Sequence, residues 1–146
     1  KTTELLSQRG IPVCAHLGLT PQSINRLGGY YVQGRDLEDK NRILSEAKQL
    51  ENAGAEIILL ECVPASLAEE ISSSLSIPTI GIGAGSATDG QIMVCYDAIG
   101  AYIWDDQPQP KFVKNFMNES NSIFEAFEKY VSEVKSLKFP SDDHSF

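Results

Sequence analysis

The sequence predicts an α/β fold with a parallel sheet, and three observations support this prediction. Short apolar runs alternate with helical patterns along the chain. The runs are continuously apolar, which is typical of strands buried on both faces. Polar or glycine residues stand at the carboxyl ends of these runs, where the active sites of parallel α/β folds gather. Four such strands could form a small open sheet or half of a (β/α)8 barrel, which typically needs about 250 residues.

The first half of the chain is expected to hold a helix, a strand and a second helix. "TTELLSQRG" resembles the last turns of a helix that stops at Gly10. "IPVCAHLG" follows as a strand that carries His16 near its end. Asp36 can cap a helix that runs until Gly54. Its apolar residues recur at helical spacing: Ile43, Leu44, Ala47 and Leu50.

The middle of the chain predicts three further strands. "EIILLE" is the second strand and ends in Glu61. Ser66, with Glu69 three residues later, forms a capping-box pattern and predicts a helix with one apolar face up to about Leu75. "IPTIGIG" is the third strand and "QIMVCY" the fourth, which places Asp97 directly after a strand.

The last part predicts an excursion, a helix and a tail. The piece from Gly100 to about Asn121 is irregular, and Ser122 with Glu125 opens the last helix. Its apolar stripe predicts core or subunit interface rather than a ligand site. "FPSDDHSF" is expected to leave the helix as a polar tail, solvated or at an interface. The stripe contains Ile123, Phe124, Phe127, Tyr130, Val131, Val134 and Leu137.

Composition and charge restrict the partners. A net charge of -8 and a pI near 4.7 argue against nucleic acid and anionic membranes, and favour a small molecule or another protein. Apolar runs are shorter than the roughly 18 residues of a membrane span, and no signal sequence opens the chain. Cys14, Cys62 and Cys95 are interpreted as reduced, buried thiols, which favours a cytoplasmic location. The length suits one packed domain, residues 1–146. Since residue 1 is Lys, the true start can lie upstream.

Five ordered motifs carry a family resemblance that covers the chain from about Gly10 to Phe146. They are "GIPVCAHLGLTPQSINRLGGYYVQGR", "LECVPASLAEEI", "IPTIGIGAGSATDGQIMV", "PKFVKNF" and "FPSDDHSF". Together they resemble the carboxyl-terminal half of the ketopantoate hydroxymethyltransferase family. The resemblance implies a parallel (β/α)8 TIM barrel of the phosphoenolpyruvate/pyruvate type. This chain would supply about the last four βα units, the C-terminal helix and the tail. Such a half-barrel alone would expose two unpaired edges and an open interior, which predicts a missing partner or aggregation.

The resemblance also implies an activity and its partners. Members transfer a hydroxymethyl group from 5,10-methylenetetrahydrofolate to 3-methyl-2-oxobutanoate in pantothenate biosynthesis, bind Mg²⁺ and assemble as decamers. The expected partners are therefore a small-molecule ketoacid, a folate and further copies of the chain. In the family the Mg²⁺ ligands lie upstream of the region matched here, so no metal ligand is assigned to this chain.

Glu61 and His16 are the residues to which the resemblance gives a direct role. Glu61 aligns with the family's proton acceptor, and a partly desolvated carboxylate at a barrel mouth suits a general base. His16 stands where the family has a His that contacts the ketoacid or its metal-bound oxygen. From spacing alone, a structural carboxylate bonded to loop amides or paired with Arg or Lys is the more common interpretation of Glu61. A lone His at a strand end is also more often a satisfied structural residue.

Two loops are candidates for the pocket wall. Gly83 and Gly85 permit close approach of a ligand, although they could equally satisfy a tight turn. Arg35 is a candidate anion contact in a Gly-punctuated loop, which could also be an ordinary surface loop. Two residues depart from the family pattern: Ala15 replaces a Gly, and its Cβ is expected to narrow the pocket, while Tyr96 replaces a common His.

Two alternatives to a catalytic half-barrel remain open. The chain could be a non-catalytic fragment or assembly module that lacks the metal site and keeps oligomer contacts. It could also be half of another, ketoacid-lyase-like barrel.

Overall fold

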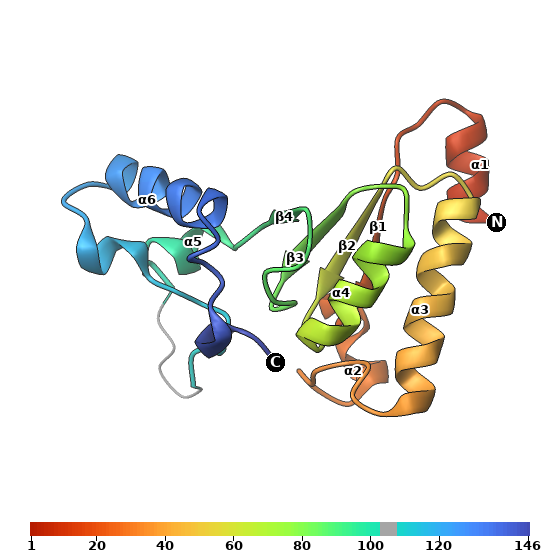
Figure 1. Ribbon diagram of the computed structural model, residues 1–146, viewed down its shortest axis with the longest axis horizontal. Coiled ribbons are helices and arrows are strands. Elements are labelled where there is room, and N and C mark those ends of the chain that lie inside the picture. The colour runs from red at the N-terminus through yellow and green to blue at the C-terminus, as the bar shows by residue number, and fades with distance from the viewer. Residues whose placement is uncertain (103–107) are drawn as a thin grey trace.

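A computed structural model describes residues 1–102 and 108–146, which form a sheet with its helices and then a small helical unit (Figure 1). Part of the predicted excursion, residues 103–107, lies outside the described residues. The described helices are α1 (Thr2–Gln8), α2 (Ile24–Leu27), α3 (Leu37–Asn52), α4 (Ala65–Ser74), α5 (Cys95–Ala98) and α6 (Ile123–Lys135). The described strands are β1 (Cys14–Gly18), β2 (Ile57–Glu61), β3 (Thr79–Ile82) and β4 (Gly90–Gln91). Short 3₁₀ turns span Pro21–Ser23, Phe116–Glu119 and Asp142–His144.

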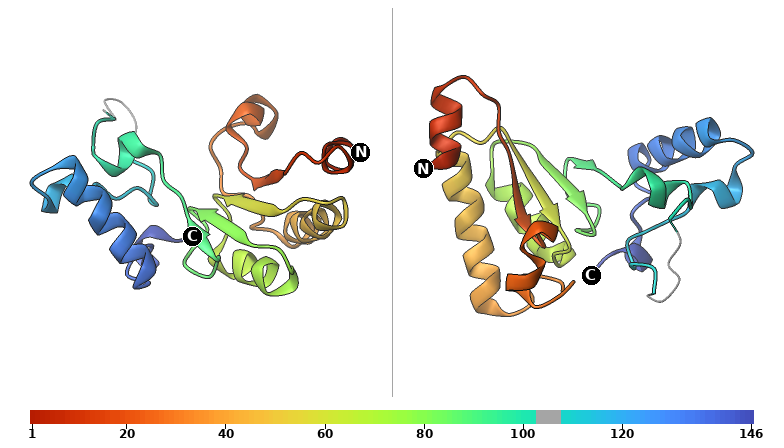
Figure 2. Two further views of the ribbon diagram at one scale, coloured as in Figure 1. Left: turned by 90° about the horizontal axis from the view of Figure 1, so that it is seen from above. Right: turned by 180° about the vertical axis from the view of Figure 1, so that it is seen from behind.

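The sheet confirms the predicted fold class. All its strand pairs are parallel, in the order β1-β2-β3-β4. Helix α3 connects β1 to β2, and α4 connects β2 to β3, as expected for a parallel sheet. Both helices lie on the same face of the sheet (Figure 2). The sheet is therefore an open arc with β1 and β4 at its edges.

Alternate residues of the strands build the main core on the helix-covered face. Leu17 and Ala15 from β1 are buried there with Ile58 and Leu60 from β2. On the other face, His16 and its β2 neighbours are only half-buried. The expectation of strands buried on both faces is thus wrong for the described sheet, since α3 and α4 cover one face. The expected effect of Ala15 is also wrong, because its methyl group faces the helices and not the face of His16.

Two of the three predicted helix caps are confirmed. The Asp36 side chain accepts a hydrogen bond of 2.8 Å from the Asp39 amide at the start of α3. Ser122 likewise accepts one of 3.2 Å from the amide of Glu125 in α6. Both caps satisfy amides that a helix start leaves without partners.

The capping box predicted for α4 is wrong. The helix begins at Ala65, directly after Pro64, so Ser66 already lies inside it. The amides of Leu67 and Ala68 bond to the Pro64 carbonyl instead. The apolar face is confirmed, because Leu67, Ala68 and Ile71 are buried in the main core.

The fourth predicted strand is mostly wrong. Strand β4 contains only two residues, and the chain then turns into α5, which includes Asp97. Met93 and Ala98 pack into a second apolar cluster instead of extending the sheet. Asp97 is buried there, which raises the pKa of its carboxyl group. The run "QIMVCY" thus contributes to a second core and not to the core of the sheet, which its pattern predicts.

The second cluster lies in the helical unit and uses only part of the α6 stripe. Phe116, Ala98, Ala126 and Phe139 form it, and Tyr130 and Val134 pack against it. Phe116, Tyr130 and Phe139 meet edge to face, with ring centroids 5.4 to 6.0 Å apart. The core prediction is wrong for the rest of the stripe, which is exposed: Ile123, Phe124, Phe127, Val131 and Leu137. For these residues the subunit interface stays a prediction.

The expected polar tail folds back on the molecule. Phe139 and Pro140 are buried, and the chain then returns toward the carboxyl end of β3 (Figure 1). The main-chain oxygen of Phe146 accepts a hydrogen bond of 2.9 Å from the Ala65 amide. The prediction of a solvated tail therefore holds for Asp142 and Asp143, which are exposed, but not for the partly buried residues 144–146; an interface role for the tail stays a prediction.

The prediction that all three cysteines are buried is wrong for two of them. All three are free thiols, but only Cys62 is buried, and Cys14 and Cys95 are exposed.

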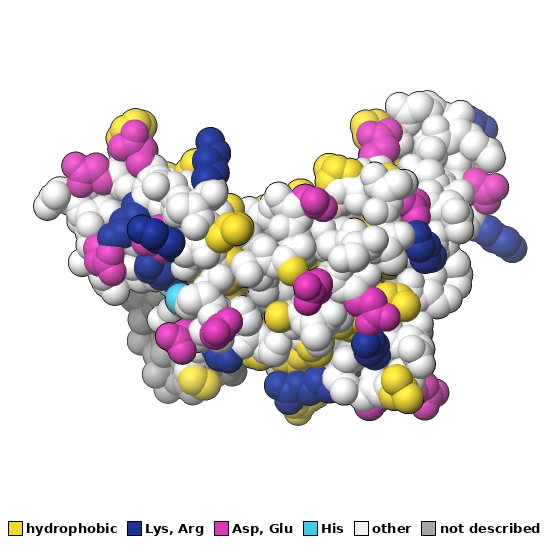
Figure 3. All heavy atoms as spheres, viewed as in Figure 1, with side chains coloured by type: hydrophobic (Ala, Val, Ile, Leu, Met, Phe, Trp, Pro, Cys, Tyr) yellow, Lys and Arg dark blue, Asp and Glu magenta, His cyan; other side chains and the backbone are white. Residues whose placement is uncertain are grey.

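On the face shown in Figure 3, acidic and basic side chains are interspersed. None of the helices formed by the described residues is long and apolar enough to cross a membrane.

Candidate functional site

The candidate site lies at the carboxyl ends of the parallel strands. Glu61 is the last residue of β2, His16 lies in β1, and Gly83 follows β3 directly. Gly18 pairs with Glu61 in the register between β1 and β2. Because side chains alternate along a strand, His16 shares a sheet face with Gly18 and therefore with Glu61. That face is the one opposite α3 and α4.

His16 and Glu61 are in close contact. Nε2 of His16 lies 3.1 Å from Oε2 of Glu61, with 22% and 15% of the two side chains exposed. The distance permits an ion pair when the imidazole is protonated. Nevertheless, this buried nitrogen has no hydrogen bond of good geometry to any residue in 1–102 or 108–146. A buried polar atom without such a hydrogen bond is uncommon in folded proteins.

Gly18 allows β1 to approach the end of β2. Its φ of +87° is in the left-handed region, and a Cβ there would lie 2.2 Å from the main-chain oxygen of Glu61. The next amide, of Leu19, donates a 2.8 Å hydrogen bond to that same oxygen. Gly18 was not among the predicted site residues, although its place after His16 at a strand end was a usable signal.

Cys62 follows Glu61 in an unusual backbone conformation. Its φ is +48°, which residues other than glycine rarely adopt. Its amide donates to Ile82 at 2.9 Å, and its carbonyl accepts from Gln33 at 2.9 Å, so neighbouring segments hold this conformation. Burial, and secondly the charge of Glu61, raise the pKa of the thiol to about 12. Cys62 is therefore a protonated thiol near neutral pH and not a nucleophile.

Gly83 and Gly85 have protein atoms, rather than open space, at their Cβ positions. Their φ angles are +61° and +75°. A Cβ on Gly83 would lie 2.8 Å from the ring of Phe112, and one on Gly85 would lie 2.6 Å from the Ala65 Cβ. Tight turns and close packing therefore explain why glycine stands at both positions. Their role as pocket lining stays a prediction.

Arg35 is exposed, and within the described part of the chain no hydrogen bond or ion pair joins it to His16 or Glu61. Its loop nevertheless reaches the site, because the Gln33 amide bonds to the carbonyl of Cys62. Gly34 is buried, and a Cβ there would lie 2.4 Å from Leu67. The loop is thus anchored while Arg35 points to solvent.

The described residues do not form a metal site by themselves. Among them, no group of three His, Cys, Asp or Glu side chains is placed to hold an ion. His16 and Glu61 provide two donors of different kinds, whereas Mg²⁺ prefers several oxygen ligands. The pair fits proton transfer better than metal binding.

Comparison with known proteins identifies the family of the chain. The family model described as ketopantoate hydroxymethyltransferase matches residues 1–142. The chain belongs to the ketopantoate hydroxymethyltransferase family. This confirms the resemblance drawn from the five motifs. The family has a TIM-barrel fold, and the four-stranded arc is a portion of that barrel.

Curated relatives of the family show how much of the protein the chain represents. A protein of Pseudomonas fluorescens (strain SBW25) is 53% identical over 146 residues, which cover 100% of this chain and 54% of the relative. Proteins of Shewanella sp. (strain ANA-3) and Chromobacterium violaceum are each 52% identical with the same coverage. All three are named 3-methyl-2-oxobutanoate hydroxymethyltransferase. The chain thus spans about half the length of the curated relatives it matches.

Proposed function

We propose that this chain is the carboxyl-terminal part of a 3-methyl-2-oxobutanoate hydroxymethyltransferase in which Glu61 is the general base. The protein would transfer a hydroxymethyl group from 5,10-methylenetetrahydrofolate to 3-methyl-2-oxobutanoate, giving ketopantoate for pantothenate and coenzyme A biosynthesis. Family membership supports the reaction class. One observation supports the site: Glu61 and His16 meet at 3.1 Å on the open face of the sheet.

The chemistry needs a base beside the ketoacid. Removing a proton from the carbon next to the ketone moves the C–H electron pair into an enolate. The enolate carbon then forms the bond to the one-carbon unit, tetrahydrofolate leaves, and water supplies the hydroxyl oxygen. Glu61 would take the proton. His16 would contact the ketoacid through Nε2, whose hydrogen-bonding capacity is unmet in the described chain.

Other groups of the proposed enzyme would come from outside the described residues. We propose that Mg²⁺ is held by the part of the family sequence that precedes this match, since three suitable ligands do not converge in residues 1–102 and 108–146. Gly83, Gly85 and Arg35 would line the pocket for ketoacid and folate. A single domain over residues 1–146, a cytoplasmic location and a homo-oligomer complete the proposal.

The substitution Glu61→Gln in the full-length protein tests the base. It keeps the size of the side chain and removes its ability to accept a proton. We expect turnover to fall about 100-fold or more, within the range of general-base catalysis, while ketoacid binding is retained. Exchange of the substrate's C3 proton in D₂O, followed by NMR, measures the step directly.

Glu56→Gln is the matched control, because Glu56 is exposed at the opposite end of β2. It changes the charge equally without touching the candidate site. Unchanged turnover in Glu61→Gln would reject the assignment of the base. Equal losses in both variants would point to a general effect of charge.

The exposed α6 residues favour a second candidate function, that of an assembly module. Phe124, Phe127 and Val131 are large apolar side chains of α6 that are exposed and do not pack into the second cluster. A chain with this role alone would associate through α6 and would not bind the ketoacid. Light scattering after size exclusion, together with a ketoacid titration, distinguishes the two functions.

A further inference from the structure

The start of α4 depends on the carboxyl-terminal tail. Helix α4 follows Glu61 after three residues, and its first amide has no cap from a preceding side chain in the described chain. Instead, the Ala65 amide donates a 2.9 Å hydrogen bond to the main-chain oxygen of Phe146. An acceptor from a segment 81 residues away in sequence thus satisfies a group that a helix start leaves open.

The same tail packs against the loop that follows β3. A Cβ at Gly83 would lie 3.3 Å from the Phe146 ring, and one at Gly85 would lie 3.8 Å from Oγ of Ser145. Phe146 also meets Phe112 edge to face at 6.5 Å between ring centroids. The tail therefore contacts both the β2–α4 connection and the loop after β3.

These contacts lead directly to Glu61. The Val63 amide donates to the Gly83 carbonyl at 3.2 Å, and the Cys62 amide donates to Ile82 at 2.9 Å. Cys62 has the positive φ that neighbouring segments must maintain. The connection from Glu61 to Ala65 is thus held by the loop after β3, which the tail covers, and by the tail itself.

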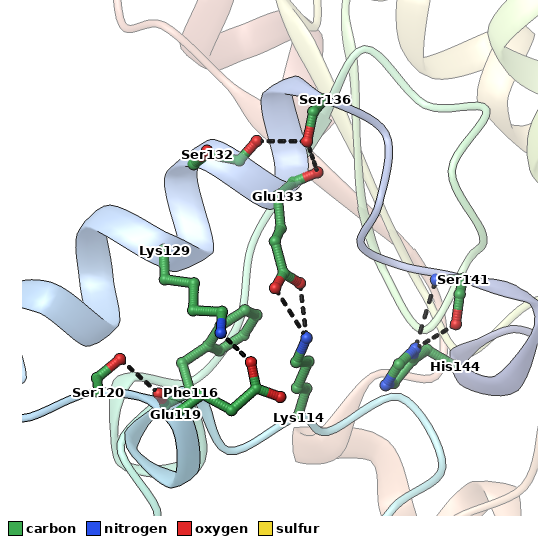
Figure 4. Close-up of polar contacts among 10 residues, drawn as sticks. All are labelled: Lys114, Phe116, Glu119, Ser120, Lys129, Ser132, Glu133, Ser136, Ser141 and His144. Atoms are coloured by element: carbon green, nitrogen blue, oxygen red, sulfur yellow. Dashed lines mark hydrogen bonds and ion pairs between the residues drawn. The ribbon is translucent and has the colours of Figure 1, made fainter.

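His144 stabilises the turn that the tail forms. Its Nδ1 lies 2.8 Å from Oγ and 3.4 Å from the main-chain nitrogen of Ser141 (Figure 4). A main-chain N–H can only donate, so Nδ1 accepts and carries no proton. The ring also packs against Phe139, with centroids 5.0 Å apart. Ser145 closes the turn with a 2.8 Å hydrogen bond to the Ser141 carbonyl.

We propose that the tail, Ser141–Phe146, keeps Glu61 in its working position, and that His144 is the positioning residue that holds the tail. The catalytic part of this inference rests on the proposed function. His144 does not touch the substrate in this proposal. It acts through the tail, the start of α4 and the loop after β3.

The charges around His144 set the direction of its pH dependence. Burial lowers the pKa of the imidazole below 6.5, and Lys114 and Lys111 lower it further, against the opposing influence of Asp143 and Glu133. Because the folded state favours the neutral ring, the contribution of His144 to docking of the tail is fully present above about pH 6.5. It is lost as the pH falls below that value and through the folded-state pKa.

Two substitutions at His144 separate a loss of contact from a loss of titration. His144→Ala removes the acceptor for Ser141. His144→Asn places an amide oxygen near the position of Nδ1, so it can accept the same hydrogen bonds without titrating. Asp143→Asn is the matched control, because Asp143 is the exposed neighbour in the same turn. All variants are made in the full-length protein.

Hydrogen exchange measured by mass spectrometry is the readout that does not require activity. Exchange of the segment from Cys62 to Ala65 should rise about five-fold in His144→Ala, as expected for the loss of a cap. Above pH 6.5, where the ring is neutral, it should stay at the wild-type rate in His144→Asn and Asp143→Asn. In the wild type, exchange of this segment should increase on acidification below pH 6.5, after correction for the intrinsic rate, and in His144→Asn this increase should disappear.

Kinetics test the catalytic part. His144→Ala should lower kcat for exchange of the ketoacid proton about 10- to 100-fold, because a small displacement of the base is costly, with a smaller change in KM. His144→Asn should restore the rate. Its pH–rate profile should lack the fall at acidic pH that the titration of His144 causes in the wild type. Unchanged hydrogen exchange at Cys62–Ala65 in His144→Ala would overturn the inference. If exchange changes as expected but even the wild type does not deprotonate the ketoacid, the tail coupling stands and the proposed function fails.

Discussion

Replacing Gly18 by Ala tests how closely β1 approaches the residue proposed as the base. The new Cβ would lie 2.2 Å from the main-chain oxygen of Glu61 and 2.8 Å from Cγ1 of Val63. The first of these is a backbone atom that already accepts the Leu19 hydrogen bond, so it cannot move away freely. One of the two strand ends must therefore shift.

The magnitude follows from comparison with Gly10, which also has a positive φ. Gly10 has φ +72° and no atom within 4 Å of the Cβ position, whereas Gly18 has φ +87° and a crowded one. Gly10→Ala should cost only the left-handed conformation, about 1–2 kcal/mol of unfolding free energy. Gly18→Ala should lose about 1–3 kcal/mol more through overpacking.

Urea unfolding followed by circular dichroism measures both variants on the same chain. An additional loss of about 2 kcal/mol lowers the midpoint by about 1 M at a typical slope, with the slope unchanged. The difference between the two variants removes the cost of the left-handed backbone, which both share, and leaves the free-energy cost of the steric clash at Gly18. Equal midpoints for Gly10→Ala and Gly18→Ala would refute the close approach of the two strands at Glu61.

Two further substitutions test the supports of the sheet. The Ser76 amide and hydroxyl donate to Glu51 at 2.6 and 2.7 Å, which lowers the pKa of this carboxyl group to about 2. Glu51→Gln should therefore reduce stability above pH 4.5, and its difference from the wild type should shrink as the pH falls from 4.5 toward 2; a difference that urea unfolding finds constant with pH would contradict this. Thr79→Val should cost about 1–3 kcal/mol in thermal unfolding, because it removes the buried hydroxyl that bonds to Asp89 and Ser72 at 3.0 and 2.7 Å. A Val variant as stable as the wild type would show that this hydroxyl is not needed.

Local patterns predicted the elements that depend on neighbouring residues. Asp36 and Ser122 cap their helices as expected, since a cap needs only amides two or three positions away. The apolar runs that contain His16 and Glu61 form strands; Glu61 is the last residue of β2, as expected, whereas His16 is the middle residue of β1. The family was also evident from motifs alone. Ser66 failed as a cap because α4 begins earlier, at Ala65 after Pro64. The acceptor for the Ala65 amide comes from Phe146, which no local pattern contains.

The sequence by itself determined the α/β class, the family and the placement of Glu61 and His16 at one edge, because hydrophobic periodicity and strand direction are local properties. Only the tertiary structure decided that these two side chains lie 3.1 Å apart, that Gly18 must be small and that the run after Gln91 joins a second core. It also decided that the tail returns to Ala65. These features depend on contacts between residues far apart in the chain, which a pattern of neighbours does not contain.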